Sequence, residues 1–442
     1  GDNNKKKKKK PNPPHRCKNR CVRFIRLAGT QKQRKGTTAT AMNKKSLGIM
    51  KNTLLSVTAL VVMNGVQQLL IYPYLTRQMG AAAFGNILVV LGIIAIIAPA
   101  LGQAVNNSRI VAQQKYECSN GDADTTILLF LIPGTAVGVW FCRSYFSSAE
   151  GLVLAALLLV FTALKNYSDV QYRLTLNYNR YFFYYLSISL GYVIGALTYN
   201  FIHSWVITLL IGEVCGFLFV TITGTIYRQP LHRTANFQRF FKDSLILFAS
   251  YLLYNGVLNL DRVLLKYLMN SETVTVFYVA SLIGKMIAML VGPLNSIAIS
   301  YLCKRERPLD RKAFGAMIAA ALGVGLVFYF GTCIVTPVFA KIAYPQIAEQ
   351  VCAYAPLANL SQILCFVGSF LLTVVLTLTG NRWQMIVQSF YAVAFLVCSV
   401  LFCHLWGFGG FIAGILLANL LRLVFTITIG LHFAGKNQKA GV

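Results

Sequence analysis

The sequence predicts an all-α membrane protein with twelve transmembrane helices in two six-helix lobes. Hydrophobic residues make up 56% of the 442 residues and charged residues only 12%, whereas a soluble domain carries roughly a quarter charged residues. Apolar runs recur along most of the chain, and many reach the roughly 20 residues that a helix needs to span a bilayer. The runs lack the alternation of polar and apolar residues that marks a membrane β-barrel.

The chain begins with a strongly basic segment, residues 1–41. This tail holds 14 of the 41 Lys and Arg residues and no apolar run long enough to span a membrane, so we expect it to be disordered. Two interpretations are open. The tail is a tether for anionic lipid or nucleic acid, or it is an extension foreign to the native protein, because Met42 resembles an ordinary start. The second is preferred, and we expect no nucleic-acid partner.

Twelve candidate spans follow the tail, and a polar, basic break divides them into two groups of six. The first six are Ser46–Tyr72, Ala83–Val105, Thr125–Phe141, Gly151–Leu164, Tyr181–Asn200 and Trp205–Ile226. The second six are Ser244–Val263, Thr273–Ile299, Phe314–Ala340, Val351–Leu378, Met385–Leu405 and Phe408–Phe433. The predicted regions are therefore an N-terminal lobe (42–226), a cytoplasmic linker (227–243) and a C-terminal lobe (244–442).

Loop charge predicts the orientation of these spans. If Met42 lies in the cytoplasm, twenty Lys and Arg residues fall on the cytoplasmic side. The opposite side receives only Arg77, Arg143, Lys266 and Lys341. This asymmetry obeys the positive-inside rule, so both termini are expected in the cytoplasm.

The two halves of the chain carry similar segments between their first and second spans. Leu75 to Gly80 leads into the second span through Phe84, and Leu265 to Asn270 leads into the eighth through Phe277. Each half contains an even number of spans, so both halves insert the same way up. This predicts a parallel repeat with a pseudo-two-fold axis along the membrane normal.

Three segments carry a family resemblance: Tyr74-Leu75-Thr76-Arg77-Gln78-Met79-Gly80 with Phe84-Gly85, Asp261-Arg262 with Phe277-Tyr278-Val279-Ala280, and Gly380-Asn381-Arg382. Together with the twelve-span layout, they resemble bacterial polysaccharide flippases of the O-antigen and capsule (Wzx) type. These flippases share a superfamily with multidrug exporters. Asn270 stands where the family usually has glycine, and since Asn tolerates similar backbone angles, we expect the turn to be kept.

The resemblance implies a function. A flippase of this kind moves a polyprenyl-diphosphate-linked oligosaccharide across the bacterial cytoplasmic membrane for surface polysaccharide synthesis, by alternating access between two lobes. Its partners would be this substrate, membrane lipids and possible polysaccharide polymerase and chain-length proteins.

Polar residues recur on one face of two predicted spans. Asn64, Gln68 and Tyr72 repeat every four residues in the first span, and Tyr251, Asn255, Asn259 and Arg262 form a similar stripe in the seventh. Such stripes are costly against lipid tails. They predict either a shared cleft for sugars or hydrogen bonds between helices, worth about 1 kcal/mol each.

Charged residues inside spans are the other candidates. Lys285, Arg422 and Arg262 would attract a diphosphate, with Arg as a bidentate clamp and Lys as a point charge. Alternatively, Lys285 pairs with Asp261 or Glu213, and Arg422 reaches toward the span end. Asp261 and Glu213 are the only carboxylates that this assignment places clearly within spans. They are candidates for ion coupling or for simple charge compensation.

Three basic residues near cytoplasmic span ends, Arg109, Lys165 and Arg173, could form an entrance for an anionic headgroup or could merely fix topology. No catalytic residues, metal ligands or cofactor motifs are predicted, and we expect no enzymatic activity. Two alternatives to the flippase remain: a cation-coupled multidrug exporter of the same superfamily, and a membrane enzyme that handles polyprenyl-linked sugars.

Overall fold

The computed structural model describes residues 54–113, 115–227, 233–291, 295, 309–379 and 381–439. All regular elements within these ranges are helices. The basic tail, the predicted start at Met42 and Gly380 of the third family segment lie outside the described residues.

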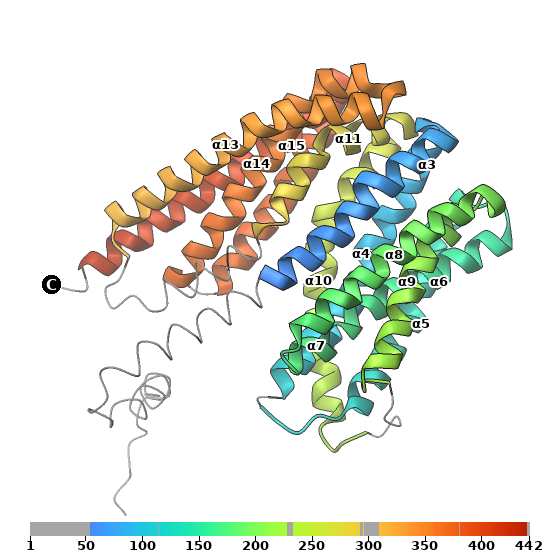
Figure 1. Cartoon of the computed structure of the whole chain (residues 1–442). Coiled ribbons are helices and arrows are strands. Elements are labelled where there is room, and N and C mark those ends of the chain that lie inside the picture. The colour runs from blue at the N-terminus through green and yellow to red at the C-terminus, as the bar shows by residue number, and fades with distance from the viewer. Residues whose placement is uncertain are drawn as a thin grey trace, which may run out of the picture. The chain divides into compact units, whose positions relative to one another are not determined.

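The first half of the described chain forms a helical bundle (Figure 1). Its elements are the π-helix η1 (Val66–Ile71), α3 (Tyr72–Met79), α4 (Ala81–Ala112), α5 (Asn120–Cys142), the short η2 (Arg143–Tyr145), α6 (Ala149–Ser168), α7 (Val170–Leu174), α8 (Tyr178–Ile202) and α9 (Trp205–Thr223). We call η1 to α9 the first bundle.

The second half starts with α10 (Phe237–Leu268) and continues with α11 (Ser271–Ala288), α13 (Arg311–Ala343), the short η3 (Pro345–Ile347), α14 (Ala348–Thr379) and α15 (Asn381–Lys439). The backbone of α15 is not helical at Trp406 and Gly407, where φ of Gly407 is 60°. A residue with positive φ favours glycine, and this break separates the predicted eleventh and twelfth spans. We call α11 to α15 the second bundle.

The chain is a many-span helical membrane protein. Ten helices of the described residues are long and apolar enough to cross a bilayer. One of them, Trp383–Ala434, covers two predicted spans. The predicted seventh span lies in α10, which is 32 residues long but is not among the ten because of its polar and charged residues. The described helices therefore lie where spans are predicted, whereas the number twelve is not confirmed by the ten candidate spans.

The two bundles meet along α4, α10 and α11. Within the first bundle α4 packs against α5 and α6, and on its other side it packs against α10 and α11. In the second bundle α14 packs against α11, α13 and α15. Helix α10 runs mainly along α4 and also touches α11 and α15. It therefore lies between the bundles, although the sequence places the seventh span in the second lobe.

The α4–α11 contact explains one glycine of the first family segment. A Cβ atom added to Gly85 would lie 1.7 Å from the backbone carbonyl oxygen of Ser271. Beside it, Thr275 Oγ1 donates to the carbonyl of Ala81 at 2.7 Å, and Ser271 Oγ donates to Asn86 Oδ1 at 2.7 Å. The two helices thus touch backbone to backbone at their N-terminal ends.

The turn at Asn270 differs from the expected one. Gly80 before α4 has φ of 84°, but Asn270 before α11 is extended, with φ of −152°. Its side-chain Oδ1 instead accepts hydrogen bonds from the backbone N–H and the hydroxyl of Thr273, at 2.9 and 2.8 Å. Asn270 is an N-cap, so it does not imitate the backbone angles of a glycine.

Candidate functional site

Lys285 forms an ion pair with Asp261. Its Nζ, from α11, donates to Asp261 Oδ2 on α10, and the side chains are 18% and 6% exposed. The ammonium also lies 5.4 Å from the centroid of the Phe277 ring. Of the alternatives for Lys285, the structure shows the pair with Asp261, while Glu213 has another partner.

Arg262 joins the same cluster through an aromatic ring. Its guanidinium carbon lies 5.1 Å from the centroid of Tyr278 on α11, and its backbone N–H donates to Asp261 Oδ1 at 2.9 Å. Among the described residues, the buried Nε of Arg262 has no acceptor. Tyr278 in turn packs against Tyr72, with ring centroids 5.9 Å apart. The first span, α10 and α11 therefore meet around Arg262.

Arg422 lies inside the second bundle and is only 4% exposed. Its Nη2 donates to Ser369 Oγ at 3.1 Å and its Nη1 to Cys365 Sγ at 3.6 Å, both on α14. The guanidinium lies 4.8 Å from the centroid of the Tyr391 ring, and Nε has no acceptor. None of the ion pairs among the described residues includes Arg422. It therefore does not reach out toward the span end.

The polar stripe of α10 faces α4. Asn107 Nδ2 on α4 donates to the Tyr251 hydroxyl at 2.7 Å. Asn255 is 7% exposed and its Nδ2 has no acceptor, whereas Asn259 Nδ2 donates to the carbonyl of Asn255 at 3.0 Å. Tyr251 thus makes a hydrogen bond between helices, one of the two possibilities for this stripe.

The stripe of the first span is altered by the π-helix η1, which covers Val66–Ile71. Residues five apart come together there, and Gln67 Nε2 donates to the Tyr72 hydroxyl at 3.1 Å. Asn64 donates to the carbonyl of Leu60 at 2.8 Å, and Gln68 is half-buried. The predicted common face of Asn64, Gln68 and Tyr72 assumed regular α-helical spacing, which is interrupted here.

Glu213 is paired within the first bundle. Lys165 Nζ and the Tyr192 hydroxyl both donate to Glu213 Oε1, at 2.5 and 2.7 Å. Glu213 is 3% exposed and its Oε2 has no partner. Lys165 is itself only 11% exposed. In this structure Lys165 pairs with Glu213 and does not line an open entrance, because α6 continues past the predicted span end and Lys165 reaches α9.

Arg109 and Arg173 also contact buried groups. Arg109 Nη1 donates to the Tyr167 hydroxyl at 3.4 Å, and Tyr167 donates to Asp124 Oδ1 at 2.7 Å. Arg173 Nη1 donates to Asn106 Oδ1 at 3.3 Å, and its side chain is 39% exposed. Of the three residues predicted at the entrance, Arg173 is the one with a substantially exposed side chain.

The sequence missed buried carboxylates. Asp124 is 6% and Asp169 8% exposed, although Asp261 and Glu213 were expected to be the only carboxylates within spans. Asp169 accepts from Asn106 Nδ2, from the hydroxyls of Tyr181 and Tyr185 at 3.4 and 3.1 Å, and lies 3.9 Å from Arg173 Nη1. Tyrosine hydroxyls donate hydrogen bonds to both carboxylates. The spacing of residues along the sequence does not reveal these contacts.

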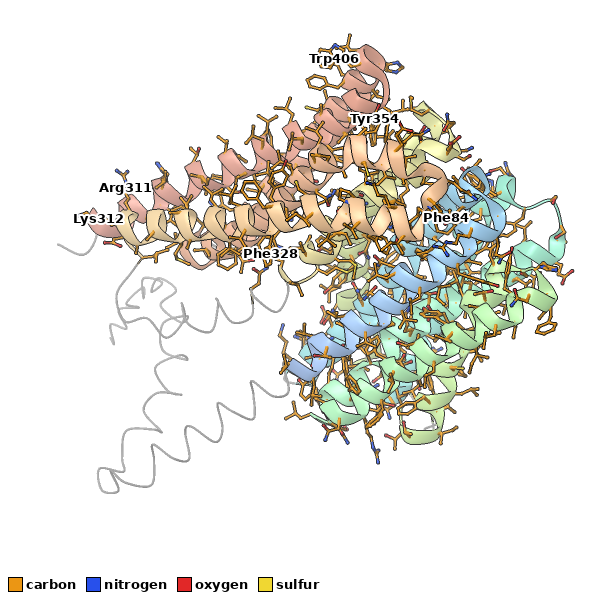
Figure 2. All side chains as sticks on the ribbon, turned by 45° about the horizontal axis from the view of Figure 1, so that its top comes forward. Phe84, Arg311, Lys312, Phe328, Tyr354 and Trp406 are labelled. Carbon is orange, nitrogen blue, oxygen red and sulfur yellow. The ribbon has the colours of Figure 1, made fainter. Side chains whose placement is uncertain are left out.

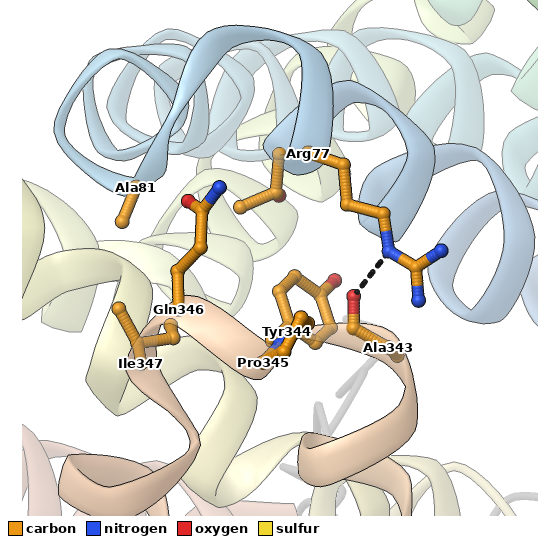
Figure 3. A pocket seen from close by; sticks show the side chains of 8 residues that line it. Arg77, Ala81, Ala343, Tyr344, Pro345, Gln346 and Ile347 are labelled. Carbon is orange, nitrogen blue, oxygen red and sulfur yellow. Dashed lines mark hydrogen bonds between the residues drawn. The ribbon is translucent and has the colours of Figure 1, made fainter.

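Arg77, in the last turn of α3, joins the two bundles through a hydrogen bond to Ala343 (Figure 3). Arg77 Nε donates to the carbonyl of Ala343 at 3.2 Å, and Nη2 donates to the carbonyl of Ile342. A cation at the C-terminal end of α13 is also favoured by the helix dipole. A pocket lined by residues such as Tyr344 and Gln346 lies at this contact. Arg311 and Lys312 lie at the remote end of α13 (Figure 2).

Arg77→Ala should loosen this contact. Losing both donors from an exposed site costs about 1 kcal/mol, which corresponds to roughly a fivefold increase in the population of separated states. Maleimide labelling of Ala81→Cys, a buried position beside Arg77, should rise by this factor. Arg143→Ala is the matched control, because Arg143 stacks on Trp140 and should leave labelling unchanged. If Ala81→Cys is labelled equally with and without the Arg77→Ala substitution, Arg77 does not hold the two bundles together at this contact.

The chain shares its fold with multidrug resistance transporters. An inward-facing structure of a MATE family transporter of the MOP superfamily matches 87% of this chain and 100% of its own, with a TM-score of 0.66 and 14% identity. An outward-facing one matches 88% and 96%, with a TM-score of 0.61 and 16% identity. A MATE structure in the straight conformation matches 89% of this chain and 96% of its own, with a TM-score of 0.62 and 16% identity. No protein-family profile and no curated protein match the sequence. At these identities the similarity shows the fold, an all-helical membrane architecture with two lobes.

Proposed function

We propose that the protein is a flippase for a polyprenyl-diphosphate-linked oligosaccharide in the bacterial cytoplasmic membrane, with both termini in the cytoplasm. It would work by alternating access between the two bundles, and the surface polysaccharide would be built from the units that it exports. The neighbouring folds, described in inward-facing and outward-facing conformations, support such a cycle.

The observation that carries this proposal is an excess of positive charge where the bundles meet and in the second bundle. Arg262, Lys285 and Arg422 lie there together with Asp261, the one buried carboxylate from α10 to α15 among the described residues. Charges in a membrane interior are costly and usually serve a function. A diphosphate would balance this positive charge, whereas an organic cation would be repelled by it.

The remaining candidates have roles in this scheme. Arg173, whose side chain is 39% exposed, would meet the headgroup first. Tyr72, Asn64 and Gln68 of the first span and Asn255 and Asn259 of α10 would contact sugars once the bundles separate. Asp261 and Glu213 are the candidates for ion coupling, and the unpartnered Oε2 of Glu213 is where a proton would reside.

The runner-up is a cation-coupled multidrug exporter, which the shared fold favours equally. A carboxylate available to an organic cation would be needed. Asp261 and Glu213 are each occupied by a lysine, which argues for the flippase. An enzyme acting on polyprenyl-linked sugars is the third possibility.

Deleting the gene in its bacterial host tests these functions. We expect surface polysaccharide to disappear and lipid-linked units to accumulate inside the cell, and a chain starting at Met42 to restore export. Normal polysaccharide combined with sensitivity to cationic dyes would instead establish the drug exporter. If the lipid-linked units that accumulate lack a chemical modification found in the parent strain, the protein is instead the membrane enzyme that introduces it.

A further inference from the structure

We propose that the anionic phosphate group of the transported molecule binds at the guanidinium of Arg422, between α14 and α15, and that Lys285 does not hold it. This assignment rests on the proposed function and chooses among its cations. It is drawn from the contacts of each cation with its neighbours.

Charge balance separates the candidates. The ammonium of Lys285 is neutralised by Asp261 Oδ2. The Arg262 guanidinium stacks on Tyr278 and has no ion pair among the described residues, but Arg262 is only half-buried, so its charge is less desolvated than that of Arg422. Arg422 is more deeply buried than Lys285, yet its polar partners are neutral, the Ser369 hydroxyl and the Cys365 thiol. A buried charge without a counter-charge is strongly unfavourable. An anion would therefore gain most at Arg422.

The local geometry suits a phosphate. A guanidinium carries five N–H donors, and Nε of Arg422 is buried with no acceptor. The Ser369 hydroxyl accepts from Nη2 at 3.1 Å, so its own hydrogen is available for a second anion contact. The guanidinium carbon lies 4.8 Å from the centroid of the Tyr391 ring, and this cation–π contact helps to hold the guanidinium in place. A fork of this kind binds phosphate oxygens in a bidentate manner.

The site is connected to the seam between the bundles through α10. Helix α10 touches α15, which carries Arg422, and Tyr254 of α10 is 52% exposed. A headgroup that enters along α10 would pass this tyrosine on its way to Arg422. The diphosphate would then lie in the second bundle, with the sugars toward the polar stripe of α10.

Binding to the purified full-length protein in detergent tests the assignment. The probes are farnesyl diphosphate, inorganic pyrophosphate, uncharged farnesol and the cation tetraphenylphosphonium. We expect Arg422→Met to bind farnesyl diphosphate about 10- to 100-fold more weakly than the wild type. Arg422→Lys should bind with an affinity between these two. A doubly neutral Asp261→Asn/Lys285→Met protein should bind at least about tenfold more tightly than Arg422→Met, and Asp243→Asn, at an exposed position of α10, should stay within about threefold of the wild type. If the wild type binds inorganic pyrophosphate, the diphosphate headgroup is sufficient for binding. If it binds farnesyl diphosphate but not pyrophosphate, the lipid is also needed.

Thermal stability without ligand provides a second readout. Arg422→Met removes an uncompensated charge and should melt no lower than the wild type, which a purely structural arginine would not allow. Two results would overturn the assignment while leaving the flippase proposal intact. One is equal affinity of the wild type and Arg422→Met for farnesyl diphosphate. The other is an affinity of the doubly neutral protein that falls as far as that of Arg422→Met. A wild-type protein that binds tetraphenylphosphonium and no diphosphate would overturn the proposed function itself.

Discussion

Replacing Asp261 by Asn is expected to lower the free energy of unfolding by about 3–5 kcal/mol. The substitution removes the partner of Lys285 and leaves an ammonium buried without a counter-charge. Asp261→Asn/Lys285→Met should recover most of the loss, because replacing both members of a buried pair by neutral groups is often nearly neutral. Unfolding by titration with sodium dodecyl sulfate, followed by circular dichroism, measures the difference.

Asp243→Asn is the matched control. Asp243 lies on the same helix α10 but is exposed, and its loss should change the free energy of unfolding by less than about 1 kcal/mol. An Asp261→Asn protein as stable as the wild type, or a double variant no better than the single one, would contradict the role of the pair.

The pair also affects how transport variants are interpreted. A single substitution of Lys285 leaves Asp261 buried and unpaired, so lost export from such a strain reports stability as well as binding. Comparison with the doubly neutral variant separates the two effects, because it removes the ammonium without leaving a lone charge.

Hydropathy alone predicted where the helices lie, since long apolar runs must be helical in a bilayer. It placed the ends of the polar spans less well. The predicted fourth span stops at Leu164, whereas α6 continues to Ser168 and carries Lys165 inward to Glu213. The predicted third span starts at Thr125, one residue after the buried Asp124 of α5. Polar residues are tolerated at these ends because neighbouring helices satisfy them, which a single sequence does not show.

The site was predicted in part for the same reason. The cost of a charge in hydrocarbon predicted that Lys285 needs either a ligand or a carboxylate, and Asp261 is that carboxylate. Nothing in the sequence signals the π-helix at Val66–Ile71, or that Arg422 hydrogen-bonds to the neutral Ser369 and Cys365 side chains. Both depend on tertiary packing: η1 contacts α8, and Ser369 and Cys365 come from another helix.

Gly85→Ala should abolish export by holding the bundles apart at the α4–α11 contact. The added Cβ would lie 1.7 Å from the Ser271 carbonyl oxygen, and since the obstacle is backbone, no side-chain rotation can relieve it. The helices must separate, which removes the closed arrangement stabilised by Arg77 and by the Thr275–Ala81 hydrogen bond. An alternating-access cycle that cannot close one side cannot transport.

Spin labels at Gln78→Cys and Lys341→Cys, both exposed positions on either side of this contact, measure the separation in a variant without native cysteines. The distance distribution should shift to longer values in Gly85→Ala. Gly256→Ala on α10 is the matched control, because no atom lies within 4 Å of its added Cβ. That substitution should keep export and distance unchanged and should stabilise the helix by up to about 1 kcal/mol. Normal export by Gly85→Ala, with the spin-label distance of the wild type, would show that the α4–α11 contact is not where the cycle closes. A closure that depends on two touching backbones tolerates no methyl group between them.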